Sequence, residues 1–211
     1  MGAFAAQTRG GGALIVATMT SDYYETHAAT FFAETCAVDM EPLYRRFLPY
    51  VCPAGHLLDA GCGSGRDARA FRERGYTVTA CDASPTLAAL AATYIGIPVA
   101  VCRLQDVAWS ETFDGIWACA SLLHVPQLEL AAVMQRLARA LKPAGVLYVS
   151  FKYGVGEREQ NGRRFTDLDE AGLTALVDRI TGLELQEIWI TADRRPERAS
   201  EQWLNARLYQ C

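Results

Sequence analysis

Apolar residues along this chain form short uninterrupted runs, with stripes of apolar residues at helical spacing between them. Uninterrupted runs are typical of strands buried on both faces of a parallel sheet, and the stripes predict helices that cover these faces. Strands that alternate with helices in this way indicate an α/β domain. The predicted strands are Leu57–Leu58, Val78–Cys81, Val99–Cys102, Gly115–Ala120, Val146–Phe151, Leu183–Thr191 and Trp203–Tyr209.

Capping residues mark where several helices begin and end. Ser84 stands before Pro85, so an N-cap is followed by a proline at the first helical position, and this helix should stop by Gly96. Thr166 and Asp169 are spaced as in a capping box, which predicts that a late helix begins there. Other helices are predicted over residues 39–48 and 66–74 and along the stripe Leu130, Val133, Met134, Leu137 and Leu141.

A glycine-rich turn follows the first predicted strand and leads directly into a helix. It contains Gly61 and Gly63, and an acidic residue, Asp82, ends the next apolar run. Glycines let the backbone turn sharply and approach a ligand closely, and a carboxylate at the end of the following strand can accept both hydroxyls of a ribose. The pattern predicts a nucleoside site at the carboxyl ends of the strands.

The spacing within this turn argues against a dinucleotide. A pyrophosphate site has the pattern G-x-G-x-x-G, whereas here Arg66 occupies the position of the third glycine and Asp59 stands two residues before the first. A carboxylate there repels a phosphate and suits a cation, such as the α-ammonium of an amino acid that carries a nucleoside. An alternative role for Asp59 is to hold the turn through backbone N–H groups.

Five motifs, in order and over about half the chain, resemble those of the class I S-adenosylmethionine (SAM) dependent methyltransferases. They are Leu-Leu-Asp-Ala-Gly-Cys-Gly-Ser-Gly (57–65), Cys-Asp-Ala-Ser-Pro (81–85), Phe-Asp-Gly-Ile-Trp (113–117), Leu-Leu-His-Val-Pro (122–126) and Leu-Lys-Pro-Ala-Gly (141–145). The resemblance implies a doubly wound, Rossmann-like three-layer sandwich with a seven-stranded, mostly parallel sheet and an antiparallel last strand. It also implies SAM as cofactor and S-adenosylhomocysteine (SAH) as product.

The resemblance assigns candidate cofactor residues. Asp59 would face the ammonium group, Asp82 the ribose hydroxyls and Ala83 an edge of the adenine. Of the three candidates in the loop after the third strand, we choose Asp106 to bind the exocyclic amine of the adenine. An alternative for Asp106 is a solvated carboxylate without a ligand. The remaining candidates are Gly61, Cys62, Gly63, Arg66, Ala120, Leu104, Gln105 and Tyr24. An alternative for Arg66 is an ion pair with Asp67 or Asp82. An alternative for Tyr24 is packing that involves no ligand.

Catalysis and acceptor binding rest on residues beyond the fourth and fifth strands. Methyl transfer from a sulfonium needs mainly positioning, and His124 is the best-placed general base, with a purely framing role as the alternative. Residues 150–166 predict a loop on the ligand side, where Lys152, Tyr153 and Arg163 would hold an anionic or polar acceptor unless the segment is only a solvated connection. Residues 193–198 mix charges and favour a solvated turn.

Length, charge and cysteine content limit the other possibilities. The 211 residues suit one domain, expected over residues 19–211 with residues 1–18 as a disordered extension that is a poor match to a signal peptide. Seven cysteines without a C-x-x-C pair favour reduced thiols, a cytoplasmic location and no metal. No stretch approaches the ~18 apolar residues of a membrane span.

A net charge of −4 disfavours duplex nucleic acid as a partner. The sequence also contains no recognisable RNA-binding appendage, zinc site or Asn-Pro-Pro-Tyr-like base-methylating motif, so a small-molecule acceptor is expected. The alternatives are a tRNA nucleotide or a protein side chain, contacted by the pairs Arg163–Arg164 and Arg194–Arg195, or a non-catalytic SAM-binding module that regulates a partner.

Overall fold

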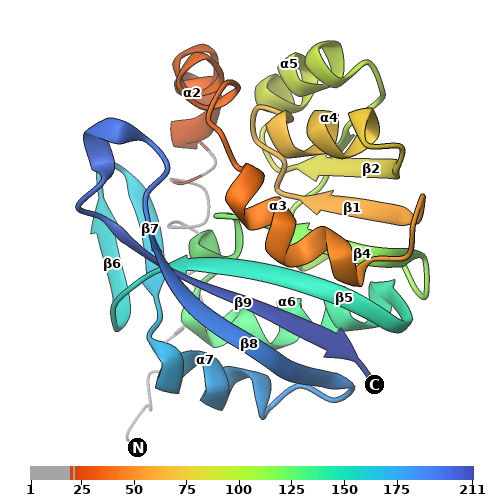
Figure 1. Ribbon diagram of the computed structural model, residues 1–211. Coiled ribbons are helices and arrows are strands. Elements are labelled where there is room, and N and C mark those ends of the chain that lie inside the picture. Colours follow the sequence, from red (N-terminus) through yellow and green to blue (C-terminus); the bar gives the residue numbers. More distant parts are fainter. Residues whose placement is uncertain (1–19, 21) are drawn as a thin grey trace, which may run out of the picture.

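A computed structural model describes Thr20 and residues 22–211 of the protein (Figure 1). The predicted extension, residues 1–18, lies outside the described residues. Seven strands form one sheet in the order β3-β2-β1-β4-β5-β9-β8, which confirms the predicted α/β fold. The strands are β1 (His56–Ala60), β2 (Thr77–Asp82), β3 (Ala100–Val101), β4 (Phe113–Ala118), β5 (Leu141–Lys152), β8 (Leu183–Ala192) and β9 (Gln202–Gln210).

Five neighbouring strands, from β3 to β5, pair in parallel, and β9 is antiparallel to both β5 and β8. From β1 the chain adds β2 and β3 toward one edge of the sheet, and from β4 it adds strands toward the other edge. The strand order therefore reverses between β1 and β4, at the centre of the sheet. Strand-end residues from the two runs converge at this point, so a ligand site is expected outside the carboxyl ends of β1 and β4.

Helices cover both faces of the sheet (Figure 1). Trp117 and Tyr148 point to the face covered by α3 (Glu41–Phe47) and α4 (Arg66–Glu73), where their rings stack at 3.8 Å. Their neighbours Ile116 and Leu147 point to the opposite face, covered by α6 (Gln127–Ala140) and α7 (Glu170–Val177). This alternation buries both faces of the central strands.

The remaining helices are α5 and several short elements. Ser84 caps α5 (Pro85–Ile95) by accepting a hydrogen bond from the Leu87 N–H, and Gly96 ends it, both as predicted. The others are α2 (Ala28–Thr35), η1 (Leu48–Tyr50), η2 (Leu104–Asp106), η3 (Leu122–His124) and η4 (Pro196–Arg198). Among the described residues, no helix combines the length and apolarity that a membrane crossing requires.

Two predictions about residues 150–170 were wrong. The expected loop contains a hairpin of β6 (Gly156–Gln160) and β7 (Arg163–Asp167), joined by Asn161 and Gly162 at positive φ. The late helix α7 begins after Asp169, whose carboxylate is itself the N-cap and accepts from the Gly172 N–H at 2.7 Å. The Thr166 hydroxyl instead donates to the Val125 carbonyl, because Thr166 belongs to β7.

Candidate functional site

Two adjoining cavities open at the carboxyl ends of the parallel strands. The smaller has a volume of about 150 Å³ and is lined by the ends of β1 and β2 and by η2. The larger, about 390 Å³, extends over β5 to the β6–β7 hairpin and to the segment between β8 and β9. Both include the residues Tyr24, Phe31, Gly61, Gly63, Ala120 and His124. The two cavities therefore meet at these shared residues.

The glycine turn after β1 contributes backbone to both cavities. Gly61 and Gly63 have φ of 78° and 54°, a conformation that residues with a Cβ rarely adopt. A Cβ on Gly61 would lie 2.5 Å from the Cβ of Ser121, and a Cβ on Gly63 would lie 3.0 Å from the Phe31 ring. Close packing therefore requires glycine at both positions, and Cys62 in the same turn lines the larger cavity.

Asp82 lies at the end of β2 and lines the smaller cavity with Ala83. Its two carboxylate oxygens accept hydrogen bonds from the N–H groups of Gly63 (2.8 Å) and Ser84 (2.9 Å). Burial raises the pKa of Asp82 in spite of these bonds. Each oxygen keeps a second lone pair for a ligand hydroxyl.

Arg66 is paired with its neighbour in the larger cavity. Its guanidinium donates two hydrogen bonds, of 2.7 and 2.8 Å, to the Asp67 carboxylate. Asp67 also accepts from the Tyr44 hydroxyl (2.5 Å) and the Trp117 indole (2.8 Å). Burial opposes ionisation of Asp67, but the Arg66 charge and these hydrogen bonds outweigh it and lower the pKa. Of the pairings considered for Arg66, the structure contains the one with Asp67.

Leu104 and Gln105 of η2 line the smaller cavity on the side of β3. The Gln105 side-chain amide donates to the Glu129 carboxylate at 3.0 Å, which holds η2 against the start of α6. These two residues are the part of the η2 loop that reaches the cavity.

Three predicted site residues lie outside both cavities as the described residues form them. Asp59 is 2% exposed and accepts from the Ala68 N–H at 2.9 Å, so its contact is with the backbone at the start of α4. Asp106 forms an exposed ion pair with Arg103 at 2.7 Å. The hydroxyl of Tyr153 turns to Glu170 at 3.1 Å.

His124 and Tyr24 form a hydrogen-bonded pair where the cavities meet. The Tyr24 hydroxyl and His124 Nε2 are 2.8 Å apart, and His124 Nδ1 is 2.8 Å from the Arg164 carbonyl. A carbonyl only accepts, so Nδ1 carries the proton and Nε2 accepts from Tyr24. Burial lowers the pKa of His124 to about 4, which leaves the imidazole neutral at pH 7. Burial also raises the pKa of Tyr24.

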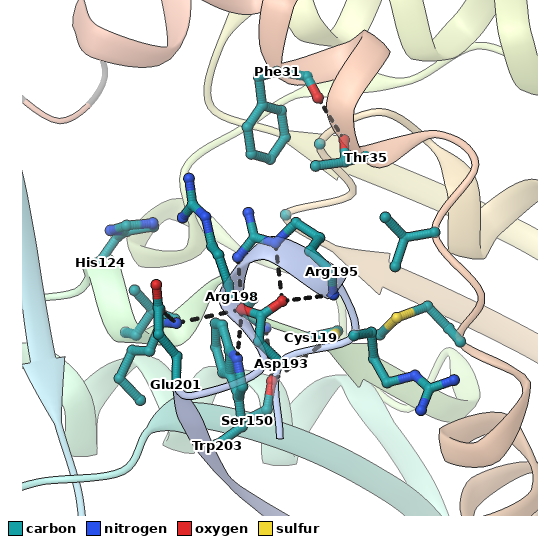
Figure 2. A pocket seen from close by; sticks show the side chains of 18 of the residues that line it. Phe31, Thr35, Cys119, His124, Ser150, Asp193, Arg195, Arg198, Glu201 and Trp203 are labelled. Atoms are coloured by element: carbon teal, nitrogen blue, oxygen red, sulfur yellow. Dashed lines mark hydrogen bonds and ion pairs between the residues drawn. The ribbon is translucent and has the colours of Figure 1, made fainter. Parts of the chain in front are cut away.

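A charged cluster forms the far wall of the larger cavity (Figure 2). Asp193 accepts two hydrogen bonds from the Arg195 guanidinium, at 2.7 and 2.9 Å, and one from the Trp203 indole at 3.0 Å. Lys152 contacts Asp193 and Glu201 and lies 4.1 Å from the centre of the Trp203 ring. Burial opposes ionisation of Asp193, but the hydrogen bonds from Arg195 and Trp203 outweigh it and lower the pKa.

Residues 57–145 match the model of a family described as a methyltransferase domain. This segment of the chain therefore has the sequence features of a methyltransferase domain. Over 123 residues it is 31% identical to malonyl-[acyl-carrier protein] O-methyltransferase from Serratia marcescens, a match that covers 56% of this chain and 46% of that protein. The chain therefore spans less than half the length of this curated relative.

Solved structures of methyltransferases share the fold. The domain superimposes with a TM-score of 0.78 on 1,6-didemethyltoxoflavin-N1-methyltransferase from Burkholderia thailandensis, solved with 1,6-didemethyltoxoflavin and SAH, at 20% identity over 97% of this chain and 93% of that one. The N-methyltransferase NodS from Bradyrhizobium japonicum, in complex with SAH, gives 0.66 at 18% identity over 88% and 97%.

Sequence reasoning missed several residues of the methyltransferase domain's larger cavity. Residues 193–198 were expected to form a solvated turn, but Asp193, Arg195 and Arg198 line the cavity. Arg158 and Asn161 of the hairpin also line it. The Asn161-Gly162 pair, a strong hairpin signal, was present in the sequence.

Proposed function

We propose that this protein transfers a methyl group from SAM to a small-molecule acceptor bound in the larger cavity. The observation that carries the proposal is the pair of adjoining cavities, which meet at Tyr24 and His124 beside the glycine turn. A volume of about 390 Å³ is in the range of sites for small molecules. The relatives named for small acceptors, such as the toxoflavin-precursor enzyme, support the same class.

The residues of the smaller cavity fit SAM. In the described structure, the hydroxyl of Ser121 is buried without a hydrogen-bond partner and lines this cavity, as expected of a group that awaits a polar ligand. Asp82 would hold the ribose hydroxyls, Ala83 and Leu104 would contact the adenine, and Gln105 would take the polar edge that we assigned to Asp106. When bound, SAM supplies a methyl group attached to a positively charged sulfur, so the protein need not provide a nucleophile.

His124 and Tyr24 would position the acceptor rather than act as a strong base. With a pKa of about 4, protonating His124 at pH 7 costs about 4 kcal/mol. The Nε2 lone pair is also occupied by the Tyr24 hydroxyl. An acceptor proton would therefore reach His124 only if Tyr24 passed its own proton to Nε2 and took the acceptor's. Orientation is the larger contribution that this geometry offers.

Three of the four arginines that could contact tRNA or protein are paired within the chain, which favours a small acceptor. Arg194 pairs with Asp39 at 3.1 Å, Arg195 with Asp193 at 2.7 Å, and Arg164 with Glu157 at 3.3 Å. Arginines that are neutralised within the chain contribute less to binding a large anionic partner. All seven cysteines are free thiols, which supports the cytoplasmic location that we include in this proposal.

The decisive experiment measures SAH release from SAM in the presence of a metabolite extract, bulk tRNA or bulk protein. We expect SAH release with the metabolite extract and none with bulk tRNA or bulk protein. Asp82→Ala is the matched control, since it should weaken SAM binding, and with it SAH release at low SAM concentration, without changing the larger cavity. Release only with tRNA or protein would contradict the small-molecule acceptor, and SAM binding without release under any condition would indicate a non-catalytic module.

A further inference from the structure

The larger cavity carries an excess of positive charge. Its lining contains seven cationic side chains and three carboxylates. The chain as a whole has a net charge of −4, so this excess is local. The cations are Arg66, Lys152, Arg158, Arg163, Arg194, Arg195 and Arg198, and the carboxylates are Asp67, Asp193 and Glu201.

Five of the seven cations are neutralised by carboxylates of the chain. Asp67 pairs with Arg66, Asp167 with Arg158, and Asp39 with Arg194, while Asp193 and Glu201 serve Arg195 and Lys152. Arg163 and Arg198 form no ion pair with the part of the chain that the structure describes. Residues 1–19 and Ser21 contain no aspartate or glutamate, so the rest of the sequence has no acidic side chain to offer them.

Arg163 is held in place without being neutralised. Its guanidinium lies 4.3 Å from the ring centre of Tyr23 and 5.2 Å from that of Phe165, and these contacts orient the side chain beside the Tyr24–His124 pair. Within the described structure, its Nε–H is buried and has no hydrogen-bond acceptor. A buried, charged donor without a partner is costly, and a bound anion would remove that cost.

Arg198, in η4, lines the same cavity. Figure 2 shows its side chain beside Arg195, directed toward the part of the cavity near His124. Because Asp193 binds Arg195 with both oxygens and also accepts from Trp203, that carboxylate is already fully engaged. Arg198 therefore remains available to a ligand.

We propose that the acceptor is an anion whose carboxylate or phosphate group binds Arg163 and Arg198. This inference rests on the proposed function, because it names the chemical class of the acceptor. Arginine suits both groups, since its planar guanidinium donates paired hydrogen bonds to either. Binding to two uncompensated arginines also predicts that affinity falls as salt rises.

The test is calorimetric titration with three probes of similar size, benzoate, phenyl phosphate and the neutral benzamide, with and without saturating SAH. At least one anionic probe should bind about tenfold more tightly than benzamide. Arg163→Gln and Arg198→Gln should each remove most of that difference. The control Arg179→Gln changes an exposed arginine in the turn after α7, outside both cavities, and should leave the difference unchanged.

The outcomes separate this inference from the proposed function. Preference for benzoate or for phenyl phosphate would distinguish a carboxylate from a phosphate acceptor. Equal affinity for benzamide and both anions, or wild-type anion affinity in both variants, would overturn the inference even if SAH binds. Failure to bind SAH would instead contradict the proposed function, while the titrations without SAH still test the anion site. If Arg163→Gln does not fold, Arg163→Met, which removes the charge and keeps an apolar side chain against the rings of Tyr23 and Phe165, carries the test together with Arg198→Gln.

Discussion

The buried imidazole of His124 should make the protein lose stability as the pH falls from about 6.5 to about 4. In the folded state burial lowers the pKa to about 4, whereas an unfolded histidine titrates near 6.5. Between these values the unfolded chain binds a proton that the folded chain does not, so acid favours unfolding. Above pH 6.5 both states are neutral and the effect vanishes.

The size of the effect follows from the shift. A difference of about 2.5 pKa units corresponds to roughly 3 kcal/mol at full effect. We expect about 2–3 kcal/mol, because the ring borders two cavities and is not fully enclosed. The loss should be half complete near pH 5 and should approach its full size near pH 4.

The measurement is urea-induced unfolding of wild type and His124→Gln at several pH values between 4 and 8. The difference in free energy of unfolding between the two proteins should shrink by about 2–3 kcal/mol on acidification. His27 and His56 are present in both proteins, so their titration cancels. A difference that stays constant over the whole range, or an imidazole resonance of His124 that titrates near pH 6.5, would refute the reasoning.

Three further predictions concern the cofactor, the fold and the reaction. Asp82→Ala should weaken SAM by roughly 1.5–3 kcal/mol through loss of hydrogen bonds to a charged acceptor; an unchanged dissociation constant in a folded variant would place the ribose elsewhere. Asp67→Asn should destabilise the fold by about 3–5 kcal/mol, because it leaves the Arg66 guanidinium buried and without a counter-charge; wild-type urea unfolding would contradict this. Tyr24→Phe should slow single-turnover methyl transfer about tenfold or more at saturating ligands, and the wild-type rate should show no step near pH 6.5, since His124 stays neutral there. A histidine-like step in that range would restore His124 as a general base.

The fold could be predicted because its signals are local. Ser84, Pro85 and Gly96 fix both ends of α5 through capping and backbone conformation alone. The Asn161-Gly162 hairpin signal is equally local, but the polar and glycine-rich composition of residues 150–166 also suits a loop, which is what we predicted. Thr166 and Asp169 show the limit of capping motifs, since either residue suits an N-cap and only tertiary pairing placed Thr166 in a strand.

The site was less predictable because it depends on which charges are paired. Asp106 and Gln105 are adjacent in the sequence, yet Arg103 draws Asp106 to the surface and Glu129 holds Gln105 at the cavity. The Asp59 carboxylate is likewise occupied within the chain, because it accepts a hydrogen bond from the Ala68 N–H at the start of α4. Which of several possible partners each side chain takes is decided by the folded structure, and a sequence motif does not show it.

The arrangement of the two cavities along the chain has a consequence for how this protein can diversify. The glycine turn, β2 and η2 contribute residues 61–105 to the smaller cavity, which we propose for the cofactor. The β6–β7 hairpin and η4 contribute residues after 150 to the larger cavity, which we propose for the acceptor. Surface hairpins and turns accept substitutions more readily than packed strands. Variation confined to residues 156–163 and 194–198 can therefore reshape acceptor choice while the inherited cofactor site stays intact, so one scaffold can acquire new substrates by changing two short segments.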